Sequence, residues 1–133
     1  MDSITTSYAP RLTHPILHFF NVLNVNDSPE RVSIELSLLP ATRLWRDKAT
    51  GILAQVIDMA VNRAGNQSIG DCTPVELELF MHCTQIPDSI KVEASVEFVC
   101  EENALFQCQI YSAQDSSDEL IAASHGTLKQ TKA

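Results

Sequence analysis

One carboxylate in this sequence lies in an unusual place. Asp58 is surrounded by apolar residues in the helix-forming stretch Ala49 to Ala64. A carboxylate in such a setting is a candidate general base, because it can take a proton from a water molecule that attacks a substrate. The simpler alternative is that Gln55, Asp58 and Asn62, spaced i, i+3 and i+7, form one solvated polar stripe. Periodicity alone favours that alternative.

A small basic cluster precedes this stretch. Arg43, Arg46 and Lys48 lie close together in a chain that is acidic overall. A local positive patch attracts phosphate even on an acidic protein. Trp45, which lies between them, either lines a binding pocket or anchors the loop. The alternative for the cluster is a set of solubilising loop charges.

The histidines and cysteines form no metal or redox motif. His14 and His18 are spaced i, i+4, but no HExxH sequence or nearby carboxylate completes a site, so no metal is expected. The four cysteines contain no CxxC pair, which excludes the common zinc-knuckle and thioredoxin-like spacings. We expect reduced thiols, most of them buried as small apolar side chains.

Two helices are expected along the chain. Apolar residues between Leu12 and Val25 recur close to the i, i+3, i+4, i+7 spacing, which predicts an N-terminal helix. The stretch Ala49 to Ala64 predicts a long helix, ended by Gly65. The polar segment Ala41 to Lys48 between them is expected to be a loop.

Alternating apolar and polar residues predict about five strands. Arg31 to Leu39 is the first, and Pro40 ends it. Four strands with short polar turns then follow the long helix, which predicts an antiparallel meander. They cover Thr73–Cys83, Ile90–Cys100, Leu105–Ser112 and Leu120–Lys129. A curved sheet of this size would bury the long helix on one face, as an α+β fold.

Length and charge limit the classes of function. The chain has 133 residues and a formal net charge of −8. We expect a flexible tail over residues 1–10 and one domain over residues 11–133. The acidic balance argues against a nucleic-acid partner. Because the sequence has no long apolar run and no export signal, we expect a cytoplasmic protein that does not interact with membranes.

Four segments are informative together: ATGILAQVIDMA, CTPVELELFMHCTQI, KVEASVEF and AASHGTL. They resemble the hotdog-fold thioesterases of the phenylacetyl-CoA thioesterase-like (PaaI-like) group. In that family a long helix begins with His-Gly-Gly, and a catalytic Asp or Glu follows seven residues after the second Gly. Gly51 matches that second Gly, and Asp58 lies seven residues further on. The family's His and first Gly are Ala49 and Thr50 here.

The resemblance implies a curved antiparallel sheet that wraps the long helix, and hydrolysis of an acyl-CoA thioester. Asp58 would act as general base on water, or as nucleophile through an anhydride. Backbone amides of Thr50 and Gly51 would bind the oxyanion at the helix N-terminus. The site would lie between two subunits of a homodimer, or of a dimer of dimers. In the family a Ser or Thr from the partner's following strand often helps, and Thr73 lies near that position.

Substrate binding is expected from the basic cluster, which would meet the coenzyme A phosphates, and from polar residues of the long helix. Coenzyme A is part of the substrate, and no cofactor is expected. Two alternatives remain. The first is a hotdog protein that binds acyl-CoA or another small ligand without hydrolysing it. The second is a cone-shaped α+β fold that binds a small ligand and whose sheet does not enclose the long helix. The candidate substrate-binding residues are Arg43, Trp45, Arg46, Lys48, Gln55 and Asn62.

Overall fold

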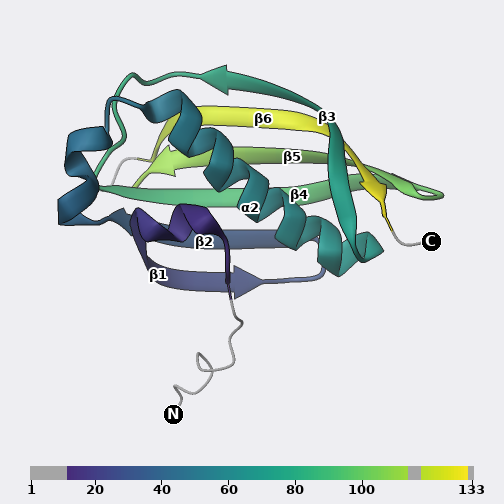
Figure 1. Cartoon of the computed structure of the whole chain (residues 1–133). Helices are drawn as coiled ribbons and strands as arrows, with labels where there is room; N and C mark the ends of the chain where they lie inside the picture. Colours follow the sequence, from purple (N-terminus) through teal and green to yellow (C-terminus); the bar gives the residue numbers. More distant parts are fainter. Residues whose placement is uncertain (1–11, 114–117, 132–133) are drawn as a thin grey trace, which may run out of the picture.

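A six-stranded antiparallel sheet curves around one long helix in the computed structural model (Figure 1). The structure describes residues 12–113 and 118–131. This is the expected α+β architecture, with one strand more than the sequence predicts. The elements in chain order are the 3₁₀ helix η1 (Pro15–His18), β1 (Phe20–Asp27), β2 (Arg31–Leu38), the 3₁₀ helix η2 (Pro40–Trp45), α2 (Ala49–Ile69), β3 (Cys72–Met81), β4 (Ser89–Cys100), β5 (Asn103–Ser112) and β6 (Glu119–Gln130).

The long helix α2 runs across the concave face of the sheet and packs against five of its six strands. It extends beyond its expected end at Ala64, to Ile69. Gly65 lies inside the helix and does not end it. A Cβ atom at this residue would come within 2.5 Å of the Cys72 Sγ and 2.7 Å of a Leu128 methyl group, so only glycine fits without a shift of its neighbours. This glycine therefore permits close packing of α2 on β3 and β6. The helix ends at Gly70, whose φ of 86° suits glycine.

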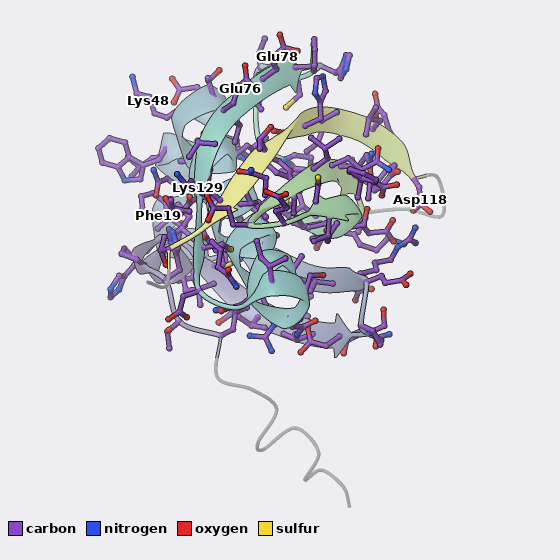
Figure 2. The ribbon with its side chains drawn as sticks, turned by 90° about the vertical axis from the view of Figure 1, so that its right-hand side faces the viewer. Phe19, Lys48, Glu76, Glu78, Asp118 and Lys129 are labelled. Carbon is purple, nitrogen blue, oxygen red and sulfur yellow. The ribbon has the colours of Figure 1, made fainter. Side chains whose placement is uncertain are left out.

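The sheet has the strand order β1-β2-β4-β5-β6-β3. The expected four-strand meander is therefore wrong in one respect: β4, β5 and β6 are consecutive neighbours, but β3 pairs with β6 at the edge of the sheet. Pro74 suits an edge strand, because proline has no N–H to donate to a neighbour. In Figure 2, β3 curves over the outside of the molecule, and Glu76 and Glu78 point outward.

The expected helix over Leu12 to Val25 is wrong. Only Pro15–His18 is helical, as one short 3₁₀ turn, and Phe20–Asp27 forms the edge strand β1 paired with β2. Pairing with β2 satisfies the backbone of this segment and buries Phe20, which outweighs the helical spacing of its apolar residues. The expected loop Ala41 to Lys48 is in part the 3₁₀ helix η2. The expected tail, residues 1–10, lies outside the described residues.

The core lies between α2 and the concave face of the sheet. The alternation predicted for β2 is confirmed, because every second residue of this strand is buried. No helix within the described ranges, 12–113 and 118–131, is both long enough and apolar enough to cross a membrane. The buried residues of β2 are Val32, Ile34, Leu36 and Leu38.

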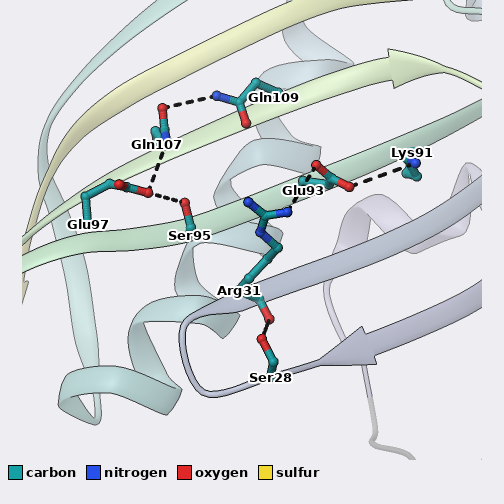
Figure 3. Close-up of polar contacts among 8 residues, drawn as sticks. All are labelled: Ser28, Arg31, Lys91, Glu93, Ser95, Glu97, Gln107 and Gln109. Atoms are coloured by element: carbon teal, nitrogen blue, oxygen red, sulfur yellow. Dashed lines mark hydrogen bonds and ion pairs between the residues drawn. The ribbon is translucent and has the colours of Figure 1, made fainter. Parts of the chain in front are cut away.

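The convex face of the sheet is polar (Figure 3). One group of contacts joins Arg31 of β2 to Glu93 of β4, with Lys91 on the other side of the same carboxylate. A second group lies on β4 and β5, where Glu97 accepts hydrogen bonds from the Ser95 hydroxyl and the Gln107 amide. The two faces of the sheet therefore differ: one holds the helix and the core, and the other meets solvent.

Candidate active site

Asp58 lies on the side of α2 that faces away from the sheet. Its Oδ2 is 3.0 Å from the Nε2 of His14, which comes from the segment before η1. Its Oδ1 accepts a hydrogen bond of 3.1 Å from the Asn62 amide, which also donates to the Asp58 main-chain carbonyl at 2.8 Å. The Asp58 side chain is 42% exposed. The carboxylate is therefore oriented by two neighbours and still open to water.

His14 is held in one orientation. Its Nδ1 accepts a hydrogen bond of 3.1 Å from the main-chain N–H of Ile16, and its side chain is only 16% exposed. Pro15 follows at the first position of η1, where a missing N–H costs nothing. Because Nδ1 acts as an acceptor, the ring proton lies on Nε2, which therefore donates to Asp58. The sequence suggests a chemical role for His14 only through its i, i+4 spacing from His18, and that spacing does not predict this contact.

A pocket of about 350 Å³ opens beside this pair, between the N-terminal segment and α2. Both His14 and Asn62 line it, so the groups that contact Asp58 also face an accessible space. Most of its lining is polar. The lining residues are Leu12, Thr13, His14, Met59, Asn62, Arg63, Asn66 and Gln67.

The N-terminus of α2 forms a second, more open pocket of about 400 Å³. Lys48, Thr50 and Gly51 all line it, together with Asp47 and Ile52. The first amides of an α-helix have no acceptor within the helix and point along its axis, so they can bind an anion or a polarised carbonyl. The structure thus brings three of the predicted site residues together here.

Asp58 and the first-turn amides are separated within one chain. Gly51 and Asp58 lie two turns apart on the same side of α2, which corresponds to about 10 Å along the axis. Thr73 is the second residue of β3, beyond the C-terminal end of α2, and pairs with Lys129 of β6. A single copy of the chain therefore does not bring Thr73 to the helix N-terminus.

The basic cluster is largely neutralised. Arg46 donates to the Asp88 carboxylate, and the Arg43 Nε lies 3.6 Å from the same carboxylate. Lys48 takes part in none of the ion pairs among residues 12–113 and 118–131. It lies beside Thr50 in the pocket at the N-terminus of α2. Trp45 lies at the end of η2 and is 46% exposed. Asp88 lies 42 residues after Arg46, so no local sequence pattern predicts this partner.

The expected polar stripe is present only in part. Gln55 is exposed, as a solvated stripe requires, whereas Asn62 and Asp58 are half-buried and contact each other. Across the described parts of the chain, no group of three or more His, Cys, Asp or Glu side chains could hold a metal ion.

No protein-family model and no curated protein matches the sequence. Solved structures do match the fold. A thioesterase family protein from Silicibacter pomeroyi aligns with a TM-score of 0.72 at 18% identity, over 87% of this chain and 88% of that one. Zebrafish thioesterase superfamily member 2 aligns with a TM-score of 0.67 at 18% identity, over 92% and 89%.

The PaaI protein of the Escherichia coli phenylacetic acid degradation operon aligns with a TM-score of 0.69 at 10% identity, over 99% of this chain and 86% of that one. The chain has the hotdog fold. The resemblance to hotdog-fold thioesterases is thus confirmed at the level of fold. Because the sheet encloses α2, the cone-shaped alternative is wrong.

Proposed function

We propose that this hotdog protein is a cytoplasmic thioesterase that hydrolyses an acyl-CoA to the free acid and coenzyme A. The observation that supports the proposal most directly is the position of Asp58. It is an oriented, water-accessible carboxylate on the long helix, seven residues after Gly51. The solved structures of similar fold that are named thioesterases support the same class of reaction.

In the proposed reaction Asp58 takes a proton from water while the water oxygen attacks the thioester carbonyl carbon. The carbonyl oxygen becomes negatively charged and is stabilised by the free amides of Thr50 and Gly51 and by the helix dipole. The carbon–sulfur bond then breaks, and the coenzyme A sulfur leaves as a thiol after it receives the proton. Direct attack by Asp58 through an anhydride is the second route, with water hydrolysing that anhydride.

The site we propose requires two copies of the chain. Asp58 lies about 10 Å along the axis from the first-turn amides, which point away from it. One subunit would supply the amides and the other the carboxylate, and Thr73 would enter from a neighbouring β3. Lys48 would contact a coenzyme A phosphate, with Trp45, Gln55 and the basic pair Arg43 and Arg46 around the substrate.

A hotdog protein that binds acyl-CoA without hydrolysis is the second candidate. It is favoured by Ala49 and Thr50, which replace the family's His and first Gly. The amides of the first turn remain in place in either case, since a backbone donor needs no particular side chain. The two candidates therefore differ in turnover and agree on binding.

The test is release of free thiol from acetyl-, hexanoyl-, palmitoyl-, phenylacetyl- and benzoyl-CoA by the wild type and by Asp58→Asn. We expect turnover of at least one thioester, and a loss of about 100-fold or more in kcat for Asp58→Asn, because the amide cannot accept the proton. Asp71→Asn, at an exposed residue beyond α2, is the matched control and should keep wild-type kcat. Absence of turnover together with tight binding of an acyl-CoA would favour the non-catalytic candidate.

A further inference from the structure

His14 and Asp58 are brought together by η1, which packs against α2. We propose that His14 is a positioning residue, which fixes the Asp58 carboxylate for proton transfer. This inference rests on the proposed thioesterase function and concerns the same site. It assigns a role to the N-terminal segment, which lies 44 residues away from Asp58 in the chain.

A continuous line of hydrogen bonds supports this role. The Ile16 main-chain N–H donates to the His14 Nδ1, and the His14 Nε2 donates to the Asp58 Oδ2 at 3.0 Å. A proton on Nδ1 would place two N–H donors against each other, so the main-chain amide selects the tautomer. The neutral imidazole therefore directs its Nε2–H group to the Asp58 carboxylate.

The backbone on which His14 lies is well anchored. Ile16 is only 5% exposed and packs in the core, and Phe20 is buried as the first residue of β1. The Phe19 carbonyl accepts hydrogen bonds from the Leu39 main-chain N–H at 2.9 Å and from the Thr42 hydroxyl at 3.1 Å. The imidazole is thus attached to a fixed part of the fold.

Asn62 completes the arrangement on the other carboxylate oxygen. Two donors from opposite sides define the plane of the Asp58 carboxylate, while its 42% exposure leaves lone pairs open to water. Fixing a reacting group in a single geometry raises its rate of reaction, because less entropy is lost at the transition state. His14 acts through Asp58 and does not itself touch the substrate in this proposal.

The test compares His14→Ala and His14→Gln with the wild type on the best acyl-CoA of the panel. His14→Ala should lower kcat about 10- to 100-fold, the range typical of groups that orient a reacting ligand, with KM changed less than about twofold. His14→Gln should recover most of kcat, because its side-chain amide can donate to Asp58 as Nε2 does. His18→Ala is the matched control, since His18 is an exposed histidine at the end of η1, four residues after His14.

The possible outcomes separate the inference from the proposed function. If Asp58→Asn loses activity but His14→Ala keeps wild-type kcat, the inference is wrong and the thioesterase function stands. A rise in KM at constant kcat would make His14 a binding residue and would also overturn it. If no acyl-CoA is hydrolysed by the wild type, the proposed function fails, and with it the role of His14 in catalysis.

A spectroscopic measurement guards against a purely structural effect of His14→Ala. In nitrogen-15 spectra of the imidazoles, His14 should show one tautomer, with the proton on Nε2. Asp58→Ala should change the His14 signals and leave those of His18 unchanged. A His14 ring that averages between tautomers, and does not respond to Asp58→Ala, would contradict the proposal.

Discussion

The four thiols of the chain differ in what surrounds them. Cys108 is completely buried on β5, and this burial raises the pKa of its thiol strongly. Burial also raises the pKa of Cys72 and of Cys83, and the negative charges of Asp71 and Glu119 respectively add to the effect. Cys100, at the end of β4, is exposed. Because the thiolate is the reactive form, Cys100 should react first.

We therefore predict that an aromatic disulfide reagent at pH 8 labels one thiol of the native protein in a fast phase. Cys100→Ser should remove that phase, whereas Cys72→Ser should leave it unchanged. Cys108 should be labelled only when denaturant unfolds the chain. A fast phase that persists in Cys100→Ser would contradict the surface described here.

At the residue scale, the sequence names candidate groups for chemistry but does not predict their contacts. Asp58 is a candidate base because of its apolar neighbours and because Gly51 and Asp58 match the motif spacing of the family that the sequence resembles. The structure places its carboxylate in an accessible position. Its contact with His14 and the contact of Arg46 with Asp88 link residues more than 40 positions apart. No local pattern records such pairs, because they depend on how the strands pair.

Gly126 of β6 shows how closely two elements approach each other. A Cβ atom at this residue would lie 2.0 Å from the Glu76 carbonyl oxygen and 2.9 Å from the Leu77 Cα, both in the backbone of β3. The register of β3 and β6 shifts between Pro74 and Glu76, next to this contact. A backbone neighbour cannot rotate away as a side chain can, so a larger residue would push the strands apart.

We expect Gly126→Ala to lower the free energy of unfolding by about 3 kcal/mol, the upper range for added volume in a packed structure. Chemical denaturation followed by circular dichroism measures this change. Gly51→Ala is the control, because a Cβ there would meet no atom within 4 Å. Equal stabilities of Gly126→Ala and the wild type would show that β3 is not held this closely to β6.

An ion pair connects the edge strand β1 to the helix α2. The Arg63 Nε and Nη2 donate to the two Asp27 oxygens at 3.0 and 2.7 Å. These hydrogen bonds hold the pKa of Asp27 below its usual value of 3.8. A lowered pKa in the folded state means that the pair stabilises the fold above about pH 3.8, and that this stabilisation is lost as the pH falls through the folded-state pKa.

Asp27→Asn should therefore be less stable than the wild type by about 1 kcal/mol at pH 7, a value kept small because both groups are partly solvated. Denaturation at a series of pH values should show the difference shrink toward zero in acid, below the folded-state pKa of Asp27. Asp71→Asn provides the control for a general change in charge. A difference that stays constant down to pH 2 would mean that the pair does not titrate as described.

At the scale of elements, the sequence predicts the helices and strands whose apolar residues follow a single repeat. The alternation of β2 and the apolar stretch of α2 both appear in the structure. The segment from Leu12 to Val25 was misread because its apolar residues belong to two elements, η1 and β1, whose combined spacing resembles a helix. The place of β3 was missed because alternation predicts a strand and contains no information about its neighbour.

In the molecule as a whole, apolar side chains of the edge strand β3 are exposed to solvent. Leu77 shares a face with Leu79 and Met81, which pack against the core, yet 42% of Leu77 is exposed. Val75 and Phe80 of the same strand are 56% and 46% exposed. An open edge strand with apolar side chains can pair with the same strand of a second copy about a twofold axis.

Our expectation is that the wild type sediments as a dimer or a larger even oligomer, and that Leu77→Lys shifts it toward the monomer. The lysine would place an unpaired charge at the centre of the proposed contact. Leu23→Lys is the control, since Leu23 is 58% exposed and lies on β1, at the opposite edge of the sheet from β3. If the site is composite as proposed, the monomeric variant should also lose thioesterase activity.

The strand order also sets the sequence of events in folding. The partner of β3 is β6, the last strand of the chain, so β3 remains unpaired until residues 119–130 have been synthesised and have joined β5. On the ribosome, a growing chain therefore carries an unpaired β3, with Val75, Leu77 and Phe80 exposed, until β6 has been made. Contacts between segments so far apart in sequence form slowly, and such intermediates are prone to aggregate. The edge that would join two finished subunits is thus also an edge that cannot pair within its own subunit until β6 has formed.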